Sequence, residues 1–154
     1  MKKPTDSVTK SQLYREFWEM TLTRIREEHP TWTRGTTSTS SWIDTSLGIP
    51  GVVVSTAWTK LGLEVQLYFN SSDAELNRQR YDDLHARREA LAARLDQRPS
   101  WDSMNGRKAA RVVLRSNFDS IDRRDCWDDA VLWLMEAQEQ LRRAYSEVAD
   151  VKTS

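Results

Sequence analysis

Two predicted strands near the middle of the chain carry side chains that could hold a metal ion. Asp44 belongs to the first of them, and Glu64 and Gln66 belong to the second. Metal-dependent nucleases hold a divalent cation such as Mg²⁺ between carboxylates on adjacent strands. The lysine that usually completes such a site is absent, because Gln66 stands in its place. Asp44, Glu64 and Gln66 are therefore an alternative catalytic set with Mg²⁺, whereas our first expectation is a protein without catalysis or cofactor.

A second candidate site combines arginines with aromatic side chains. The segment 99–118 holds four basic residues and one acidic residue, although the whole chain is neutral. Arg107, Arg111 and Arg115 follow one another at intervals of four, so a strand would carry them on one face about 13 Å apart. This spacing suits the phosphates of a nucleic-acid backbone, and Tyr68 on the same face, with Trp42 or Trp58 beside it, could stack on a base.

The same side chains also fit two structural roles without a ligand. Glu64 could form a cross-strand ion pair with Arg111, which would leave an ordinary solvated sheet face. Alternatively, the face could be the contact surface of a homodimer. Residue types alone do not separate these roles from a binding site.

Three successive strands must position these residues. The segments 41–47, 52–59 and 63–69 are rich in β-branched and aromatic residues, and glycine-containing turns separate them. Along 63–69, apolar residues alternate with polar ones, so Val65, Leu67 and Phe69 should face a covered core. Glu64, Gln66 and Tyr68 should face the opposite side.

Helices are expected on both sides of this strand run. A capping box of Thr9 and Gln12 predicts a helix that ends before His29-Pro30, and Ser72 with Glu75 predicts a second helix that runs to about residue 97. A short extended segment at 101–107, a turn at Asn105-Gly106 and a strand at 108–117 follow. Asp122 is expected to cap a last helix, whose apolar stripe is the clearest periodicity of the sequence.

This order, α-βββ-α-ββ-α, predicts an α+β two-layer sandwich. We expect a five-stranded, mostly antiparallel sheet and three helices packed mainly on one face. The predicted organisation is a flexible N-terminus at 1–8, a single domain at 9–150 and a short tail at 151–154.

Composition excludes several classes of protein. The chain has 154 residues with 23 basic and 23 acidic side chains, so no overall field favours a polyanion or a membrane surface. No apolar run approaches the roughly 20 residues of a membrane span. A single cysteine, Cys126, excludes an internal disulfide. We therefore expect a cytoplasmic protein with no membrane partner.

The chain also resembles a known bacterial family in a series of short motifs. These are the aromatic segment 14–18, the strand 63–69, the segments 73–77 and 81–84, Trp101-Asp102, the segment 107–112 and the helix 127–145. In this order they resemble the family called domain of unknown function 4268, over about residues 11–147. The sequence differs from the family pattern at Gln66 and Ala110. Many members carry this domain behind a restriction-nuclease-like domain, so the resemblance implies a recognition or assembly module in bacterial DNA processing or phage defence.

Our first expectation is therefore a non-catalytic binding or assembly module. It would contact nucleic acid or a nuclease-type protein partner through Arg107, Arg111, Arg115 and Tyr68. One alternative is a divalent-metal-dependent nuclease that uses Asp44 and Glu64. The other is a structural homodimer.

Overall fold

Five antiparallel strands form one curved sheet in the computed structural model, which describes residues 8–33, 35 and 37–153. The strands are β1 (Trp42–Ile49), β2 (Val52–Thr59), β3 (Gly62–Phe69), β4 (Ser100–Asp102) and β5 (Ala110–Arg115). Their spatial order is β1-β2-β3-β5-β4. The predicted five-stranded antiparallel sheet is confirmed, with β3 at its centre.

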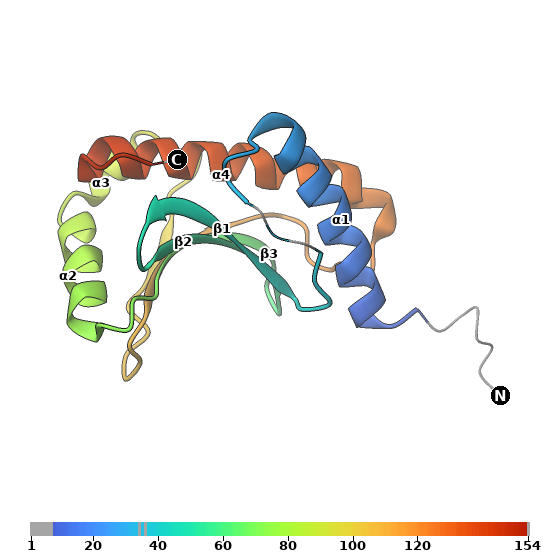
Figure 1. Ribbon diagram of the computed structural model, residues 1–154, viewed down its shortest axis with the longest axis horizontal. Coiled ribbons are helices and arrows are strands. Elements are labelled where there is room, and N and C mark those ends of the chain that lie inside the picture. The colour runs from blue at the N-terminus through green and yellow to red at the C-terminus, as the bar shows by residue number, and fades with distance from the viewer. Residues whose placement is uncertain (1–7, 34, 36, 154) are drawn as a thin grey trace.

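Helices cover one face of this sheet. They are α1 (Lys10–Glu28), α2 (Ala74–His85), the short α3 (Arg88–Ala92), the 3₁₀ turn η2 (Arg124–Cys126) and α4 (Trp127–Ala149). Figure 1 shows α4 running across the convex face, α1 and α2 towards its two ends, and no helix over the concave face. No helix of the described residues is long and apolar enough to cross a membrane. The α+β class and the two-layer arrangement are thus as predicted.

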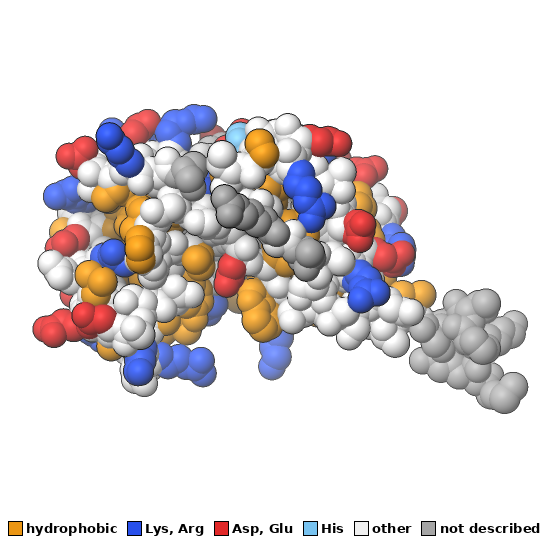
Figure 2. All heavy atoms as spheres, in the orientation of Figure 1, with side chains coloured by type: hydrophobic (Ala, Val, Ile, Leu, Met, Phe, Trp, Pro, Cys, Tyr) orange, Lys and Arg blue, Asp and Glu red, His pale blue; other side chains and the backbone are white. Residues whose placement is uncertain are grey.

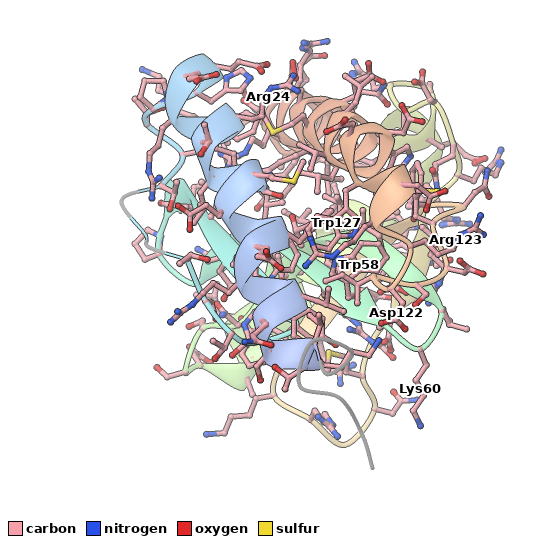
Figure 3. The ribbon with its side chains drawn as sticks, turned by 90° about the vertical axis from the view of Figure 1, so that its right-hand side faces the viewer. Arg24, Trp58, Lys60, Asp122, Arg123 and Trp127 are labelled. Carbon is pink, nitrogen blue, oxygen red and sulfur yellow. The ribbon has the colours of Figure 1, made fainter. Side chains whose placement is uncertain are left out.

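Strand alternation builds the core between the sheet and the helices. Val65, Leu67 and Phe69 of β3 are fully buried on the convex side, as the alternation predicts. At one end of this core, Phe17 of α1 packs edge-on against Trp58 and Trp127, with ring centroids 5.2 and 5.4 Å apart. Figure 3 shows these two tryptophans between α1, α4 and the sheet. The aromatic cluster therefore joins both long helices to β2.

The first helix begins where its capping box predicts. The Thr9 side chain accepts a hydrogen bond from the Gln12 backbone N–H, and the Gln12 side chain accepts one from the Thr9 backbone N–H. These two bonds satisfy donors that a helix N-terminus leaves free. Residues 1–7 of the predicted flexible N-terminus lie outside the described residues.

The second helix differs from the prediction at both ends. Asp73, not Ser72, caps α2, because its carboxylate accepts hydrogen bonds from the N–H groups of Glu75 and Leu76. The predicted single helix to residue 97 is broken after His85, and α3 follows as a separate short helix. At the break, the Arg87 guanidinium donates to the Val148 carbonyl of α4. The sequence contains no proline or glycine at this break, so no local signal predicts it. A tertiary contact is present there instead.

Two further boundaries are also corrected. Asp122 does not cap the last helix, since its carboxylate binds Lys10 at 3.1 Å and α4 begins at Trp127 after the 3₁₀ turn. The turn at Asn105-Gly106 does join an antiparallel pair, β4 and β5. However, the strands end at Asp102 and begin again at Ala110, so this connection is a longer loop than a two-residue hairpin turn.

A buried arginine of α4 ties the helix layer to β1. The Arg142 guanidinium donates to Thr45 Oγ1 at 2.8 Å and to Gln138 Oε1 at 3.1 Å, and it lies over the Trp32 ring at 4.0 Å. Because burial disfavours the charged form, desolvation lowers the pKa of Arg142 to about 9. Its Nη1 and the Gln138 Nε2 have no hydrogen-bond partner among the described residues. Sequence periodicity placed Gln138 on the buried stripe, but it gave no sign of Arg142.

The first prediction tests the packing of α4. Leu134 is fully buried, so Leu134→Ala should lower the free energy of unfolding by about 2–5 kcal/mol, measured by urea denaturation. Leu132 on the same helix is 46% exposed and provides the control, for which we expect a loss below about 0.5 kcal/mol. Equal losses in the two variants would contradict this orientation of α4.

Candidate functional site

The concave face of the sheet carries polar side chains in rows that run across the strands. One row pairs Asp44 with Ser55, Ser55 with Gln66, and Gln66 with Val113. The next row contains Ser46, Val53, Tyr68, Arg111 and Asp102. No helix covers this face, so side chains from all five strands meet on it directly (Figure 1). It is the part of the domain where a ligand would meet polar groups on a rigid support.

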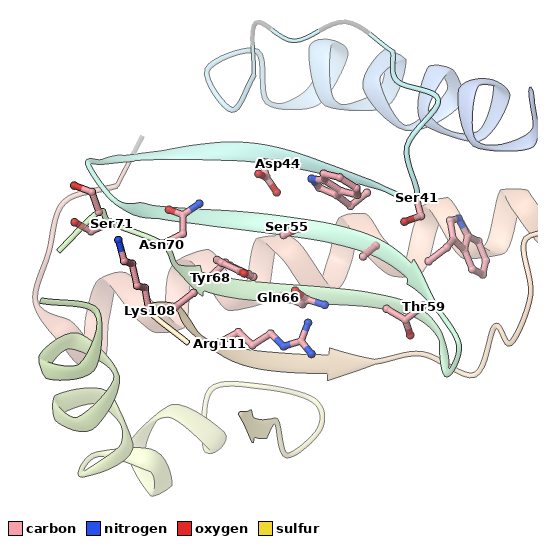
Figure 4. Close-up of a pocket in the computed structure, with 15 residues that line it drawn as sticks. Ser41, Asp44, Ser55, Thr59, Gln66, Tyr68, Asn70, Ser71, Lys108 and Arg111 are labelled. Carbon is pink, nitrogen blue, oxygen red and sulfur yellow. The ribbon is translucent and has the colours of Figure 1, made fainter. Parts of the chain in front are cut away.

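A cavity of about 600 Å³ opens on this face. Figure 4 shows Asp44 on β1, Ser55 on β2, and both Gln66 and Tyr68 on β3, with Arg111 on β5 and Lys108 just before it. Cavities of this size accept small ligands or short chain segments. The strand register, and not any contiguous motif, brings these residues together.

The predicted arginine and aromatic site is assembled in part. Arg111 and Tyr68 are register partners on β5 and β3, and both line the cavity. Arg115 lies on the same face two rows away from Arg111, opposite Glu64. Arg107 is not on this face, because it precedes β5 and lies in the loop after β4, where it lines a separate, smaller cavity. Lys108 is the second basic residue, beside Arg111, that lines the concave cavity.

Arg111 is already paired within the protein. Its Nε donates to Asp102 Oδ2 at 2.9 Å, across the β4–β5 pair. Desolvation opposes ionisation of Asp102, but the Met104 backbone N–H and the Arg111 guanidinium outweigh it and hold the pKa of this carboxyl below its ordinary value. Arg111 therefore meets a ligand as half of an ion pair, whereas no ion pair of Lys108 occurs among the described residues.

Glu64 lies at the centre of a buried network on this face. Its carboxylate is 2% exposed, pairs with Arg115 at 3.2 Å, and accepts hydrogen bonds from Gln66 Nε2 and Thr59 Oγ1 at 2.9 and 3.3 Å. The expected pair of Glu64 with Arg111 is wrong, because the β3–β5 register sets Arg115 opposite Glu64 and Arg111 opposite Tyr68. Glu64 and Gln66 are buried, whereas strand alternation predicted a solvent-facing or site-lining side for them. Gln66 does line the cavity.

The alternative catalytic set is not brought together as a ligand cluster. Asp44 lies in the row of Gln66, while Glu64 lies in the neighbouring row with its carboxylate occupied by Arg115. Gln66 directs its amide to Glu64. In the part of the chain that the structure describes, the three side chains whose metal-ligand atoms approach one another are Glu28, His29 and Glu139, elsewhere in the fold.

Asp44 is the acidic side chain that the cavity does expose. Its side chain stays accessible, yet the cavity walls partly desolvate it and raise the pKa of its carboxyl, while a hydrogen bond from Ser55 acts in the opposite direction. A carboxyl in such surroundings favours its neutral form more than a fully hydrated one does. Asp44 can therefore offer a ligand either an acceptor or a hydrogen-bond donor, depending on pH.

The two tryptophans considered for this face have different positions. Trp42 is 51% exposed and lines the cavity from β1. Trp58 reaches only the rim of the cavity, since its ring is 6% exposed and packs on Phe17 in the core. Trp42 and Tyr68 are therefore the aromatic surfaces that a ligand in the cavity could contact.

Asn77 of α2 is fully buried and supports the cavity without lining it. Its side chain accepts a hydrogen bond from the Ser71 N–H and donates to the carbonyls of Ser71 and Lys108. These three bonds fix the chain just after β3 to the chain just before β5, so they position Lys108 at the cavity. The Lys108 carbonyl is 31 residues from Asn77 in the sequence, so this contact is tertiary.

Basic and acidic side chains are mixed on one displayed face of the molecule. Figure 2 shows basic and acidic side chains interspersed on the face that it displays, without a large patch of one sign. Two basic residues, Lys108 and Arg111, and one acidic residue, Asp44, line the cavity. The charged side chains at the cavity are therefore few and of both signs.

The fold and this face define an α+β domain with an open, polar concave sheet. A family model described as "Domain of unknown function (DUF4268)" matches residues 13–149, and the chain belongs to this family, as its motifs indicated. A search of curated proteins and a search of solved structures found no match.

The second prediction compares the two arginines of this face. Arg115→Met leaves the buried Glu64 carboxylate without its cation, so the free energy of unfolding should fall by about 2 kcal/mol or more. Arg111→Met is the matched control, because its partner Asp102 is 41% exposed and can be hydrated, and we expect a loss of about 1 kcal/mol or less. A larger loss for Arg111→Met would show that Glu64 is not the central buried charge.

The third prediction concerns Asp44 and pH. The pKa of Asp44 is raised in the folded state. Ionisation of Asp44 therefore lowers the free energy of unfolding, and this loss develops as the pH rises through the unfolded-state and folded-state pKa values. Asp44→Asn removes this cost, so the variant should gain stability over the wild type at pH 7 and lose that gain near pH 3. Denaturant unfolding at the two pH values measures the difference. A gain of the same size at both would contradict desolvation of this carboxyl.

Proposed function

We propose that this domain is a non-catalytic binding module whose concave sheet face binds single-stranded nucleic acid. The observation that carries the proposal is the exposed Trp42 in the same cavity as Tyr68, with Lys108 and Arg111 on the far side. Aromatic side chains stack on unpaired bases, and basic side chains beside them contact the phosphates. This combination suits an unpaired strand better than a duplex, whose stacked bases do not reach aromatic rings on a sheet.

The charge of the face supports modest, salt-sensitive binding. Arg111 keeps Asp102 as a partner, and Arg115 is engaged by Glu64, so Lys108 is the basic residue most available to a phosphate. Each phosphate that a protein neutralises releases counterions and adds about one unit to the salt slope. We therefore expect a slope of about one to two, well below that of proteins with extended basic surfaces.

We further propose that the module acts in DNA processing or phage defence in the bacterial cytoplasm, as family members that carry a nuclease-like domain suggest. A nuclease-type protein partner on the same face and a homodimer through it are the rival proposals. Both would also bury Trp42, but neither predicts binding of a free oligonucleotide. The experiment below separates them.

The fourth prediction uses fluorescently labelled single-stranded DNA and RNA of about ten nucleotides, within the usual footprint of such domains. Trp42→Ala should weaken binding by about tenfold or more, since one base stack contributes about 1–3 kcal/mol. Lys108→Ala should weaken binding to all sequences alike and make the salt slope shallower by about one unit. Fluorescence anisotropy at several salt concentrations measures both effects.

The matched controls lie on the turn between β2 and β3, outside the cavity. Leu61 is 65% exposed and Lys60 is next to it, so Leu61→Ala and Lys60→Ala should bind as the wild type does. No binding near 50 mM salt, or equal losses in the controls, would refute the nucleic-acid proposal. Mg²⁺-dependent cleavage of the oligonucleotide that is lost in Asp44→Asn would instead support the nuclease alternative.

A further inference from the structure

Three metal-ligating side chains meet where the end of α1 approaches α4. They are Glu28, His29 and Glu139, whose ligand atoms all lie within 4.8 Å of one another. His29 Nε2 is 3.7 Å from Glu139 Oε1. Figure 3 shows the last turns of α1, beyond Arg24, beside α4. The cluster lies on the helix side of the domain and shares no residue with the concave cavity.

The imidazole in this cluster is held in one orientation. The His29 ring stacks on Trp32 with centroids 3.8 Å apart and an interplanar angle of 3°. Trp32 is itself 5% exposed, and the Arg142 guanidinium lies 4.0 Å from its ring. Since two groups cannot occupy the same 4 Å layer above one ring, His29 and Arg142 lie on opposite faces of Trp32. The stack therefore fixes the ring with Nε2 directed to Glu139.

The ligand set has a defined chemical preference. One imidazole nitrogen and two carboxylate oxygens suit Zn²⁺ and neighbouring divalent transition metals, whereas Mg²⁺ and Ca²⁺ prefer oxygen alone. Tetrahedral Zn²⁺ with bonds of about 2.0–2.2 Å separates its ligand atoms by roughly 3.5 Å. His29 Nε2 and Glu139 Oε1 are 3.7 Å apart and all three ligand atoms lie within 4.8 Å of one another, so side-chain rotation would bring them to this separation. The three side chains are 30–39% exposed, which leaves room for water as a fourth ligand.

Ion pairs among the described residues do not neutralise both carboxylates of this cluster. Arg24 binds Glu28 one turn earlier on α1, and His29 balances Glu139 only when it is protonated. The carboxylates of Glu28 and Glu139 lie within 4.8 Å of one another beside this imidazole, and Arg24 pairs with Glu28. A divalent cation would neutralise both, and it would join residues that are more than a hundred positions apart in the sequence.

We propose that Glu28, His29 and Glu139 form a binding site for a divalent transition metal of the zinc class, which fastens the end of α1 to α4. The metal should bind the folded chain but not the unfolded chain, so it should raise the melting temperature of the protein.

Isothermal titration calorimetry with Zn²⁺, together with visible absorption after Co²⁺ addition, tests this site. We expect one ion per chain, a Co²⁺ band typical of mixed nitrogen and oxygen ligands, and no comparable binding of Mg²⁺. His29→Ala should weaken Zn²⁺ binding by about tenfold or more, since even loss of an outer partner of a ligand costs that much. His85→Ala, which alters the other histidine, should not.

A second pair of variants keeps the test valid if His29→Ala destabilises the fold. Glu139→Gln retains the shape of the ligand and should also weaken binding by about tenfold or more, whereas Glu136→Gln on the same helix should not. Absence of one-to-one Zn²⁺ binding in the wild type would overturn the proposal. Unchanged affinity in both His29→Ala and Glu139→Gln would overturn it as well, because the metal would then lie elsewhere.

Discussion

The central strand β3 is buried on both faces, and the rest of the structure accommodates this constraint. On the convex side its apolar residues meet α4. On the concave side no helix is present, so Glu64 and Gln66 can be buried only if neighbouring side chains satisfy them. Thr59 and Arg115 do so for Glu64, and the Glu64 carboxylate in turn accepts a hydrogen bond from the Gln66 amide. This network closes the floor of the sheet at one end, and the accessible cavity beside it is lined by residues of β1, β2, β3 and the start of β5.

The convex layer contains a comparable buried polar contact. Arg142 of α4 reaches Thr45 of β1 and the ring of Trp32, so one guanidinium links the last helix, the edge strand and the segment that follows α1. Burial of a charge is costly, and the hydrogen bonds and the aromatic face compensate only part of that cost. The same tryptophan holds His29 on its other face. A core contact thereby positions the candidate metal ligands at the surface.

The two faces of the sheet therefore contribute different chemistry. The concave face offers aromatic rings, a carboxyl with a raised pKa and basic groups that are largely neutralised by the protein itself. Its recognition would depend on shape and stacking more than on long-range attraction. The helix side offers a nitrogen and oxygen ligand set at the junction of two helices. A metal ion at that site would affect the stability of the fold directly. Its effect on the concave cavity would be transmitted only through the shared sheet.

The sequence by itself determined the elements whose signals are local. The capping box at Thr9, the alternation along β3 and the stripe of α4 each depend on neighbours within a few residues, so the α+β class and the antiparallel sheet could be predicted. The register between the strands determined which side chains meet on the concave face. Strand pairing set Arg115, and not Arg111, opposite Glu64, and it placed Tyr68, Lys108 and Trp42 around one cavity. The break after His85, the buried Arg142 and the meeting of His29 with Glu139 likewise depend on contacts between residues distant in sequence, which no local pattern specifies.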